Sequence, residues 1–237
     1  MFRLLPGSYF TKQYDREKLE IIMNKRNKYY YIVFIAVCFL IYGNTIYHNF
    51  TLDDKIVISE NENVQRGWKA IPSIFTHTTD YGFVENKEGT AYRPVTLMSY
   101  AVEIGMFGPK PGVHHFFNLL FYTILCLLIY YLLSEILFPN KNKLFSVFIT
   151  LLFIIHPIHT EIVSNIKSRD EIFSFIFFIL SIIFLFRYFK AKKLYKIGVS
   201  ILFYCLSLFS KENAVTFIFI FPLLDFRNPT IASPSSL

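Results

Sequence analysis

Four short polar clusters interrupt an otherwise apolar sequence, and each carries side chains that could do chemistry. In chain order they are Leu52-Asp53-Asp54, Tyr92-Arg93-Pro94, His114-His115 with Asn118, and His156-Pro157-Ile158-His159-Thr160-Glu161 followed by Lys167-Ser168-Arg169-Asp170-Glu171; a further charged group is Ser210-Lys211-Glu212-Asn213. A carboxylate held at partial burial can serve as a general base, and a guanidinium can hold a phosphate in a bidentate fork. The residue types therefore fit acid–base chemistry on a phosphate-bearing or sugar-bearing substrate.

Each cluster also has a plainer interpretation. Asp53 and Asp54 are candidate bases, but most pairs of Asp residues form solvated turns or helix caps. Arg93 either binds a phosphate or anchors the chain at a membrane interface. A Lys–Glu pair such as Lys211 and Glu212 can be purely structural. The sequence leaves these alternatives open.

The histidines give only weak support for a metal site. His114 and His115 are adjacent, so on a helix they point about 100° apart and seldom share one ion. His159 and Glu161 could be ligands, but the chain has no HExxH spacing and no cysteine cluster. A divalent metal is therefore possible but unsupported. No Walker loop or GxGxxG motif supports nucleotide chemistry.

The composition indicates which elements must position these clusters. The 237 residues are 54% hydrophobic and 17% charged, with a mean hydropathy of +0.41. A soluble fold of this size cannot bury that much apolar surface, so an all-α, polytopic transmembrane helix bundle is predicted. Six apolar stretches are candidate spans: residues 29–47, 116–138, 144–155, 172–189, 197–209 and 214–224. A full span needs about 20 residues, so the first, second and fourth qualify, and the shorter ones are expected to border a protein-lined cavity.

The charges of the connecting segments predict the orientation. If the N-terminus is cytoplasmic and each span crosses once, the inner segments carry most of the Lys and Arg residues and the outer segments hold more acids than bases. This distribution obeys the positive-inside rule, so the net charge of +7 is a topology signal and nucleic acid is not an expected partner. All six histidines fall at the outer side, which predicts a non-cytoplasmic site: His48, His77, His114, His115, His156 and His159.

The first outer loop, about residues 48–115, is too long for a plain connector. Two amphipathic helices that lie along the membrane surface are expected in it, in preference to a soluble domain. The second begins at Pro94, a good first residue of a helix, and is expected to be broken by the residues that follow Ile104: Gly105, Gly108, Pro109, Pro111 and Gly112. The first is marked by apolar residues at spacings of four, three and four: Val64, Trp68, Ile71 and Phe75.

Three regions are therefore predicted along the chain. Residues 1–28 form a cytoplasmic leader, residues 29–225 a transmembrane domain, and residues 226–237 a cytoplasmic tail. The tail does not read as a further span, so the chain is expected to be truncated. Its true start is either Met1 or Met23.

The order and spacing of the polar clusters resemble the membrane domain of the GT-C glycosyltransferases. Within them the chain looks most like the transmembrane and tetratricopeptide-repeat-containing O-mannosyltransferases and their bacterial relatives. The resemblance covers about residues 40–225. The matching motifs are Phe50-Thr51-Leu52-Asp53-Asp54; Asn63-Val64 with Trp68 and Ile74-Phe75; Tyr92-Arg93-Pro94-Val95-Thr96; His115-Phe116-Phe117-Asn118; His156-Pro157-Ile158-His159-Thr160-Glu161-Ile162-Val163 with Ser168-Arg169-Asp170-Glu171; and Ser210-Lys211-Glu212-Asn213-Ala214-Val215-Thr216.

The resemblance implies a multi-span enzyme that takes a sugar from a polyprenyl-phosphate donor. The sugar would go to a protein or glycan acceptor on the non-cytoplasmic face of the lipid bilayer, either the bacterial inner membrane or the endoplasmic reticulum. The presumed base maps onto Asp53 or Asp54. The residues that the resemblance implies at the donor phosphate or sugar are Arg93, His114, His115, His156, His159, Glu161, Arg169, Lys211 and Glu212.

Other functions also fit the sequence. A non-catalytic membrane protein, either a transporter half or an assembly partner, is the main alternative, although transporters place their polar residues near the bilayer midplane. A ligase or phosphotransferase acting on lipid-linked glycans would use similar Arg and His clusters. An inactive, truncated copy of the glycosyltransferase is a further possibility.

Overall fold

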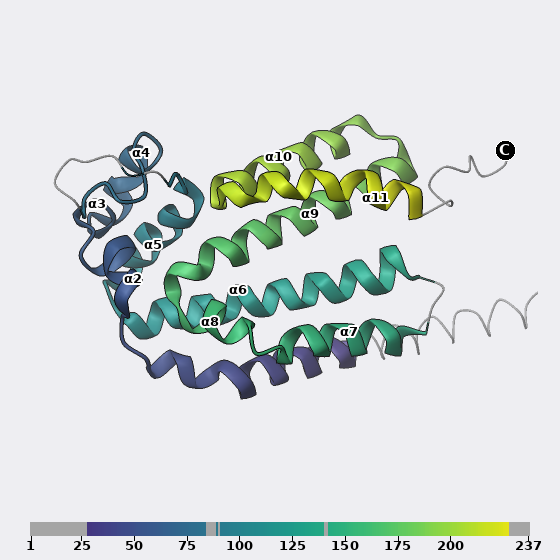
Figure 1. The fold of residues 1–237 in the computed structure, drawn as a ribbon, viewed down its shortest axis with the longest axis horizontal. Helices are drawn as coiled ribbons and strands as arrows, with labels where there is room; N and C mark the ends of the chain where they lie inside the picture. Colours follow the sequence, from purple (N-terminus) through teal and green to yellow (C-terminus); the bar gives the residue numbers. More distant parts are fainter. Residues whose placement is uncertain (1–27, 84–88, 90, 140–141, 228–237) are drawn as a thin grey trace, which may run out of the picture.

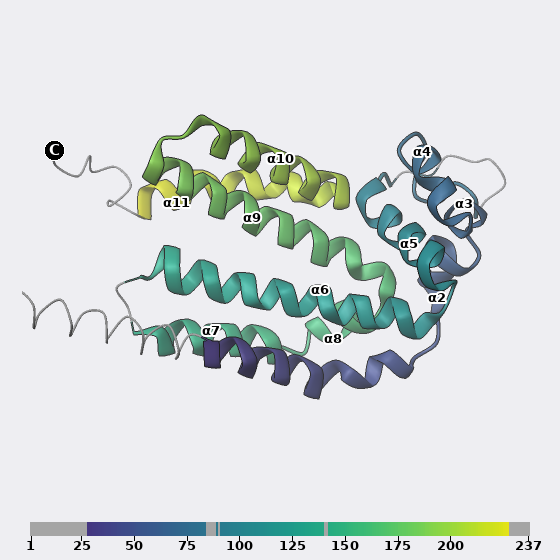
Figure 2. The same cartoon turned by 180° about the vertical axis from the view of Figure 1, so that it is seen from behind.

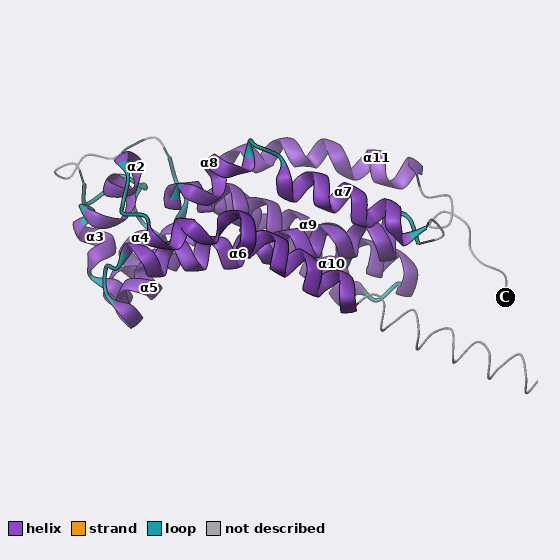
Figure 3. Ribbon diagram, turned by 90° about the horizontal axis from the view of Figure 1, so that it is seen from below, coloured by secondary structure: helices purple, strands orange, loops and turns teal. Residues whose placement is uncertain are grey.

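The computed structural model describes residues 28–83, 89, 91–139 and 142–227, so the predicted leader and most of the predicted tail lie outside the described residues. These residues form helices and no strands, as Figure 3 shows, and the predicted all-α class is confirmed. Long helices run side by side, and short helices gather at one end (Figures 1 and 2). We call the long helices of residues 28–47 and 111–227 the bundle, and residues 48–107 the cap.

Three helices of the bundle are long and apolar enough to cross a membrane. They are Lys28–Tyr47, Pro111–Leu137 and Ile166–Ala191. They coincide with the first, second and fourth predicted spans, so the expectation of three full-length spans is confirmed. Within them, α6 comprises Pro111–Tyr131 and α9 comprises Arg169–Ala191. The chain is therefore an integral membrane protein.

The remaining apolar helices of the bundle are shorter than a full span. They are α7 (Lys143–Ile155), α10 (Leu194–Ser210), and a 3-10 segment, Glu212–Phe219, that continues into α11 (Ile220–Arg227). The short helix α8 (His159–Ser164) lies between α7 and α9 in the chain. The polar clusters that the sequence singled out follow α7 and α10, and they begin α8 and the Glu212–Phe219 segment.

Serine pairs hold α9 against α10. The hydroxyls of Ser181 and Ser200 each donate to the other's main-chain carbonyl at 2.8 Å, and Ser207 donates to the carbonyl of Ser174 at 2.7 Å. All four side chains are buried. Small polar residues of this kind let two transmembrane helices approach closely while the hydroxyls find partners inside the protein. They fix the end of α10, from which Lys211 follows.

The cap contains α2 (Leu52–Asp54), α3 (Glu62–Gln65), α4 (Ile71–Ile74) and α5 (Pro94–Phe107). It has an apolar core separate from that of the bundle. The buried members of this core are Val57, Ile58, Val64, Ala70, Ile74, Leu97, Tyr100, Ala101, Ile104 and Ile166. Ile166 begins the 3-10 turn that leads into α9, so the core of the cap reaches the start of that helix.

The first amphipathic segment of the outer loop is not a single helix. Gly67 has a φ of +60°, and the segment divides there into α3, a 3-10 turn and α4. Val64 and Ile74 are buried, whereas Trp68 and Phe75 are about half exposed. The spacing of apolar residues therefore marked the helical region but not its break.

The second amphipathic segment is the single helix α5, which ends at Phe107, inside the predicted breaking stretch that begins at Gly105. Gly105 itself stays helical and allows close packing, because a Cβ atom there would lie 2.4 Å from the indole Nε1 of Trp68. A Cβ atom at Gly67 would likewise lie 3.1 Å from the Cα of Gly105. The helix is capped by Gly108, whose φ is +76°.

Candidate functional site

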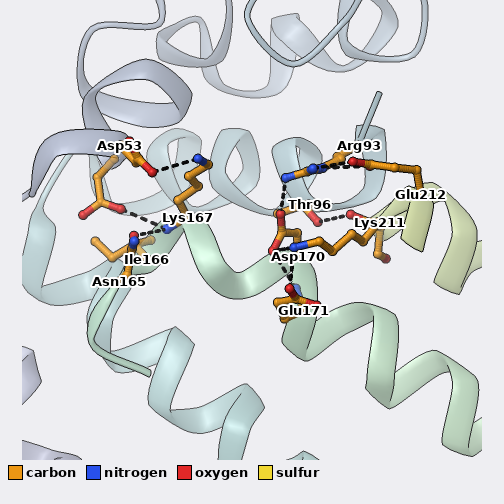
Figure 4. Close-up of polar contacts among 12 residues, drawn as sticks. Asp53, Arg93, Thr96, Asn165, Ile166, Lys167, Asp170, Glu171, Lys211 and Glu212 are labelled. Atoms are coloured by element: carbon orange, nitrogen blue, oxygen red, sulfur yellow. Dashed lines mark hydrogen bonds and ion pairs between the residues drawn. The ribbon is translucent and has the colours of Figure 1, made fainter. Parts of the chain in front are cut away.

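Residues 165–171, which we call the junction turn, lie where the cap meets the bundle. They comprise Asn165, the 3-10 turn Ile166–Ser168 and the first residues of α9. Figure 4 shows two groups of charged side chains on either side of this turn, one around Asp53 and one around Arg93. The turn therefore brings residues that are far apart in the sequence to one end of the bundle.

The two aspartates of the first cluster have different surroundings. Asp54 is fully buried; one of its oxygens accepts from the amide and hydroxyl of Thr51 at 3.0 Å each, and the other accepts from the amide of Lys167 at 2.9 Å. It thus caps α2 and holds the junction turn. The Asp53 side chain is 47% exposed and pairs with Nζ of Lys167 at 2.8 Å. Of the two, Asp53 has the carboxylate that a substrate can reach.

Arg93 and Lys211 lie on the other side of the junction turn. Both contact Asp170, whose side chain is only 4% exposed. Arg93 also holds Glu212 in a fork, with Nε 3.0 Å from Oε2 and Nη2 2.5 Å from Oε1, and Nζ of Lys211 lies 2.5 Å from Oε1 of Glu171. We call these five residues the Arg93–Lys211 cluster. Its two cations share one buried carboxylate, and each has a half-exposed glutamate of its own.

The fork shifts the acid–base equilibria of both partners. Hydrogen bonds from Arg93 lower the pKa of Glu212 to about 2. The hydrogen bond to Glu212 in turn raises the pKa of Arg93 above its usual value. Both side chains therefore stay ionised across the physiological pH range.

Arg169, predicted at the donor, is enclosed between the cap and the bundle. Its side chain is fully buried and donates to Glu103 at 2.5 Å, to Ser99 at 3.0 Å, to Asn118 at 3.2 Å and to the carbonyl of His114 at 2.9 Å. These contacts join α5, α6 and α9. The geometry gives Arg169 a structural task, and its role at the donor stays a prediction.

His114 and His115 are fully buried as well. Nδ1 of His114 lies 2.5 Å from Oε2 of Glu103, and Nε2 of His115 lies 3.4 Å from the carbonyl oxygen of Asn49. The second ring nitrogen of each has no hydrogen-bond partner among the described residues. The two rings thus serve different neighbours, and their roles at the donor stay predictions.

His159 lines a cavity of about 270 Å³ in the bundle. Burial lowers the pKa of His159, so the imidazole is neutral at pH 7. Glu171, which pairs with Lys211, also lines this cavity. The remaining lining residues are apolar or aromatic: Tyr122, Leu125, Phe153, Ile162, Ile172, Phe175 and Phe217. The cavity is therefore apolar inside and adjoins the Arg93–Lys211 cluster at its edge.

His156 and Glu161 are exposed. The His156 ring lies 5.9 Å from that of His159, and its Nδ1 accepts from the amide of Ile158 at 3.3 Å. Within the described part of the chain, no group of three or more His, Cys, Asp or Glu residues is placed to hold a metal ion. The expectation about metals stays a prediction.

Four charged residues that the junction requires had no role at the site assigned from the sequence. Lys167, Asp170 and Glu171 stand inside one polar run, so their signal was present but unspecific. Glu103 is an isolated acid on the otherwise apolar α5. Because an unpaired buried charge is costly, a lone acid in such a helix indicates a buried cationic partner.

The chain is similar in sequence to known protein O-mannosyl-transferases. The chain is 30% identical over 145 residues to human protein O-mannosyl-transferase TMTC1, a match covering 60% of this chain and 16% of the human protein. It is 28% identical over 148 residues to human protein O-mannosyl-transferase TMTC3, which covers 61% and 15% of the two chains. The resemblance to these O-mannosyl-transferases is confirmed.

A Drosophila melanogaster protein O-mannosyl-transferase, Tmtc1, extends the similarity to 194 residues at 23% identity, 82% of this chain and 22% of the fly protein. The chain thus spans between about a sixth and a quarter of the length of the O-mannosyl-transferases it resembles. No family model matches the chain, and no solved structure matches it.

Proposed function

We propose that this chain forms the membrane site of a glycosyltransferase that moves a sugar from a polyprenyl-phosphate donor to an acceptor hydroxyl on the non-cytoplasmic face. One observation carries the proposal: the junction turn brings a half-exposed carboxylate, Asp53, to the same end of the bundle as the cations Arg93 and Lys211 (Figure 4). The printed names of the relatives point to mannose as the sugar.

Asp53 is the better candidate for the base. A general base must reach the proton it removes, and Asp53 is half exposed. Both oxygens of Asp54 are occupied by main-chain amides and the Thr51 hydroxyl. Asp54 then acts by fixing the junction turn, through which Lys167 is held beside Asp53.

The donor is proposed to lie across the Arg93–Lys211 cluster and the apolar cavity beside it. The cavity offers aromatic and aliphatic surface to an isoprenoid chain, with Phe153, Phe175 and Phe217 in its wall. The two cations face the phosphate. His159 lines the same cavity; its Nδ1 lies 2.6 Å from the carbonyl oxygen of Phe153 and so carries the proton of the neutral ring, which leaves Nε2 as an acceptor for a sugar hydroxyl.

The chemistry follows from these positions. The acceptor oxygen bonds to the anomeric carbon while its proton passes to the Asp53 carboxylate. The bond from the anomeric carbon to the phosphate oxygen breaks, and its electron pair leaves with the polyprenyl phosphate. Since the leaving phosphate gains negative charge as this bond breaks, nearby cations stabilise the transition state more than the bound donor.

The membrane arrangement belongs to the same proposal. We place the cap on the non-cytoplasmic side and let α7, α10 and residues 214–224 complete six crossings of a GT-C-like bundle. The end of α9 and its connection to α10, which carry Lys190, Lys192 and Lys193, lie at the opposite end of the bundle from the cap, and this supports the orientation. In it, α5 lies at the membrane surface.

Paired asparagine variants test the assignment of the base. Membranes containing the chain would be supplied with radiolabelled polyprenyl-phosphate mannose and assayed for labelled protein or glycan. Asp53→Asn should lower transfer by about 10²-fold or more, the usual value of a general base, with unchanged thermal stability. Asp54→Asn should instead lower the melting temperature, because a donating amide nitrogen replaces one of the two oxygens through which the buried Asp54 accepts hydrogen bonds.

Undiminished transfer by Asp53→Asn would rule out Asp53 as the base. Glu60→Gln serves as the control, because Glu60 makes an exposed ion pair with Lys55 elsewhere in the cap. Movement of a solute across the membrane without a glycosylated product would favour a transporter over the enzyme.

A further inference from the structure

Arg93 holds two carboxylates that differ greatly in exposure. Asp170 contacts Nη1 and is almost fully buried, whereas Glu212 occupies Nε and Nη2 and is 52% exposed. Asp170 also has Lys211 within 3.6 Å. Asp170 is therefore a fixed part of the cluster, and Glu212 can leave Arg93 by rotating its side chain into solvent.

The edge of Arg93 that Glu212 covers is the one suited to an oxyanion. Nε and Nη2 form parallel hydrogen bonds to the two oxygens of Glu212, at 3.0 and 2.5 Å. Phosphate oxygens take the same two-point position on a guanidinium. With this edge occupied, the Arg93 side chain is only 16% exposed, so an incoming phosphate must displace the carboxylate.

The charge balance favours such an exchange. The Arg93–Lys211 cluster has two cations and three carboxylates, so it carries one net negative charge and repels a further anion. A phosphodiester carries a single negative charge, as does a carboxylate. Replacing the Glu212 carboxylate with a phosphodiester therefore leaves the charge around Arg93 unchanged.

We propose that Glu212 is a displaceable placeholder. Its carboxylate occupies the position on Arg93 where the phosphodiester of the donor binds, and it must rotate away from Arg93 before the donor can bind. This inference rests on the proposed function for the class of ligand. Beyond the proposed function, the inference gives Glu212 a role of its own: its carboxylate competes with the donor for Arg93, so it weakens donor binding and covers Arg93 when no donor is present. Glu171, the corresponding glutamate on Lys211, lines the apolar cavity and remains in place.

The test measures the affinity of a ligand for the full chain by isothermal titration calorimetry, with the chain purified in a non-ionic detergent. The probe is a ten-carbon isoprenyl methyl phosphodiester, and the ten-carbon isoprenyl alcohol is its neutral counterpart. Glu212→Gln should bind the phosphodiester about fivefold more tightly than the unsubstituted chain, because a competing exposed ion pair is removed. Affinity for the alcohol should not change.

Three further variants make the result specific. Glu212→Asp, which keeps the charge but shortens the reach to Arg93, should give an intermediate affinity. Glu171→Gln removes the same charge from the same cluster and should tighten binding less than Glu212→Gln. Glu60→Gln, in an exposed ion pair with Lys55, should have no effect.

The outcomes separate the placeholder from the proposed function. Equal tightening by Glu171→Gln and Glu212→Gln would overturn the placeholder, because the effect would then be general electrostatics. Phosphodiester binding that is unchanged or weaker in Glu212→Gln would also overturn it, while leaving the donor site in place. If neither the unsubstituted chain nor any variant prefers the phosphodiester to the alcohol, both the placeholder and the proposed donor site fail.

Discussion

Arg169 lies inside the junction between cap and bundle, Arg93 lies at its surface, and their surroundings are opposite. Arg169 is fully buried, and its donors go to Glu103, Asn118 and other groups inside the protein. Arg93 lies at the surface of the junction, where one of its carboxylate partners is half exposed. An identical side chain thus holds the fold in one place and offers an exchangeable contact in the other.

The energetic reason lies in the environment of each pair. A buried ion pair contributes little net stability when intact, but removing one partner leaves an uncompensated charge in a low dielectric. An exposed ion pair is screened by water, so its loss costs little and its partners can be exchanged. The Arg93–Glu212 pair, with Glu212 half exposed, is closer to an exposed pair of this sort, whereas the Arg169–Glu103 pair is buried.

The largest effect is expected from breaking the buried pair. Glu103→Gln leaves Arg169 without its carboxylate and removes the acceptor near Nδ1 of His114. We expect a loss of about 3–5 kcal/mol in the free energy of unfolding, measured by thermal or denaturant unfolding in detergent. The exposed Glu60→Gln serves as the reference and should be near neutral. A loss under 1 kcal/mol would show that Arg169 is solvated and that the comparison is mistaken.

A smaller effect is expected at the surface arginine. Arg93→Lys keeps the charge but loses the two-point fork to Glu212. Stability should fall by only about 1 kcal/mol, whereas sugar transfer from the polyprenyl-phosphate donor should fall at least tenfold. Arg66→Lys, at an exposed arginine elsewhere in the cap, is the control. If Arg93→Lys destabilises the chain as much as Glu103→Gln, the two arginines do not differ as described.

The smallest effect concerns acid pH. The pKa of Glu212 is lowered from 4.5 to about 2 by Arg93, so its ionised form stabilises the fold. That contribution is fully present above pH 4.5 and is lost as the pH falls from 4.5 towards 2. The difference in melting temperature between the unsubstituted chain and Glu212→Gln should therefore shrink over this window and stay constant from pH 5 to 8. A difference that instead changes between pH 5 and 8 would contradict the Arg93–Glu212 contact.

Much of the bundle could be predicted because the bilayer imposes simple rules. Apolar length separated the three full-length helices from the shorter ones, and the structure agrees. The cap was harder. Helical spacing located its helical residues, but the roles of its two glycines depend on the tertiary structure. Gly67 breaks the first helical segment, whereas Gly105 lets Trp68 pack closely against α5.

The site was predictable only as a set of candidates. Asp53, Asp54, Arg93, Arg169 and Lys211 all stood out by residue type, and all lie at the same end of the bundle. Their separate environments could not be read from the sequence, because burial depends on which helices pack over them. Asp54, for example, is buried and accepts a hydrogen bond from the main-chain amide of Lys167, which is 113 residues away in the chain.

The sequence by itself determined that the chain is a helical membrane protein with its polar clusters at one end, because periodicity, apolar length and charge are local properties. It also carried the motifs by which the chain resembles the O-mannosyl-transferases. Only the tertiary structure decided that Asp54 and Arg169 are enclosed, that Asp53 and Glu212 stay about half exposed, and that Arg93 is covered by Glu212. Exposure and charge pairing arise from contacts between distant segments, and the junction turn makes most of those contacts at once.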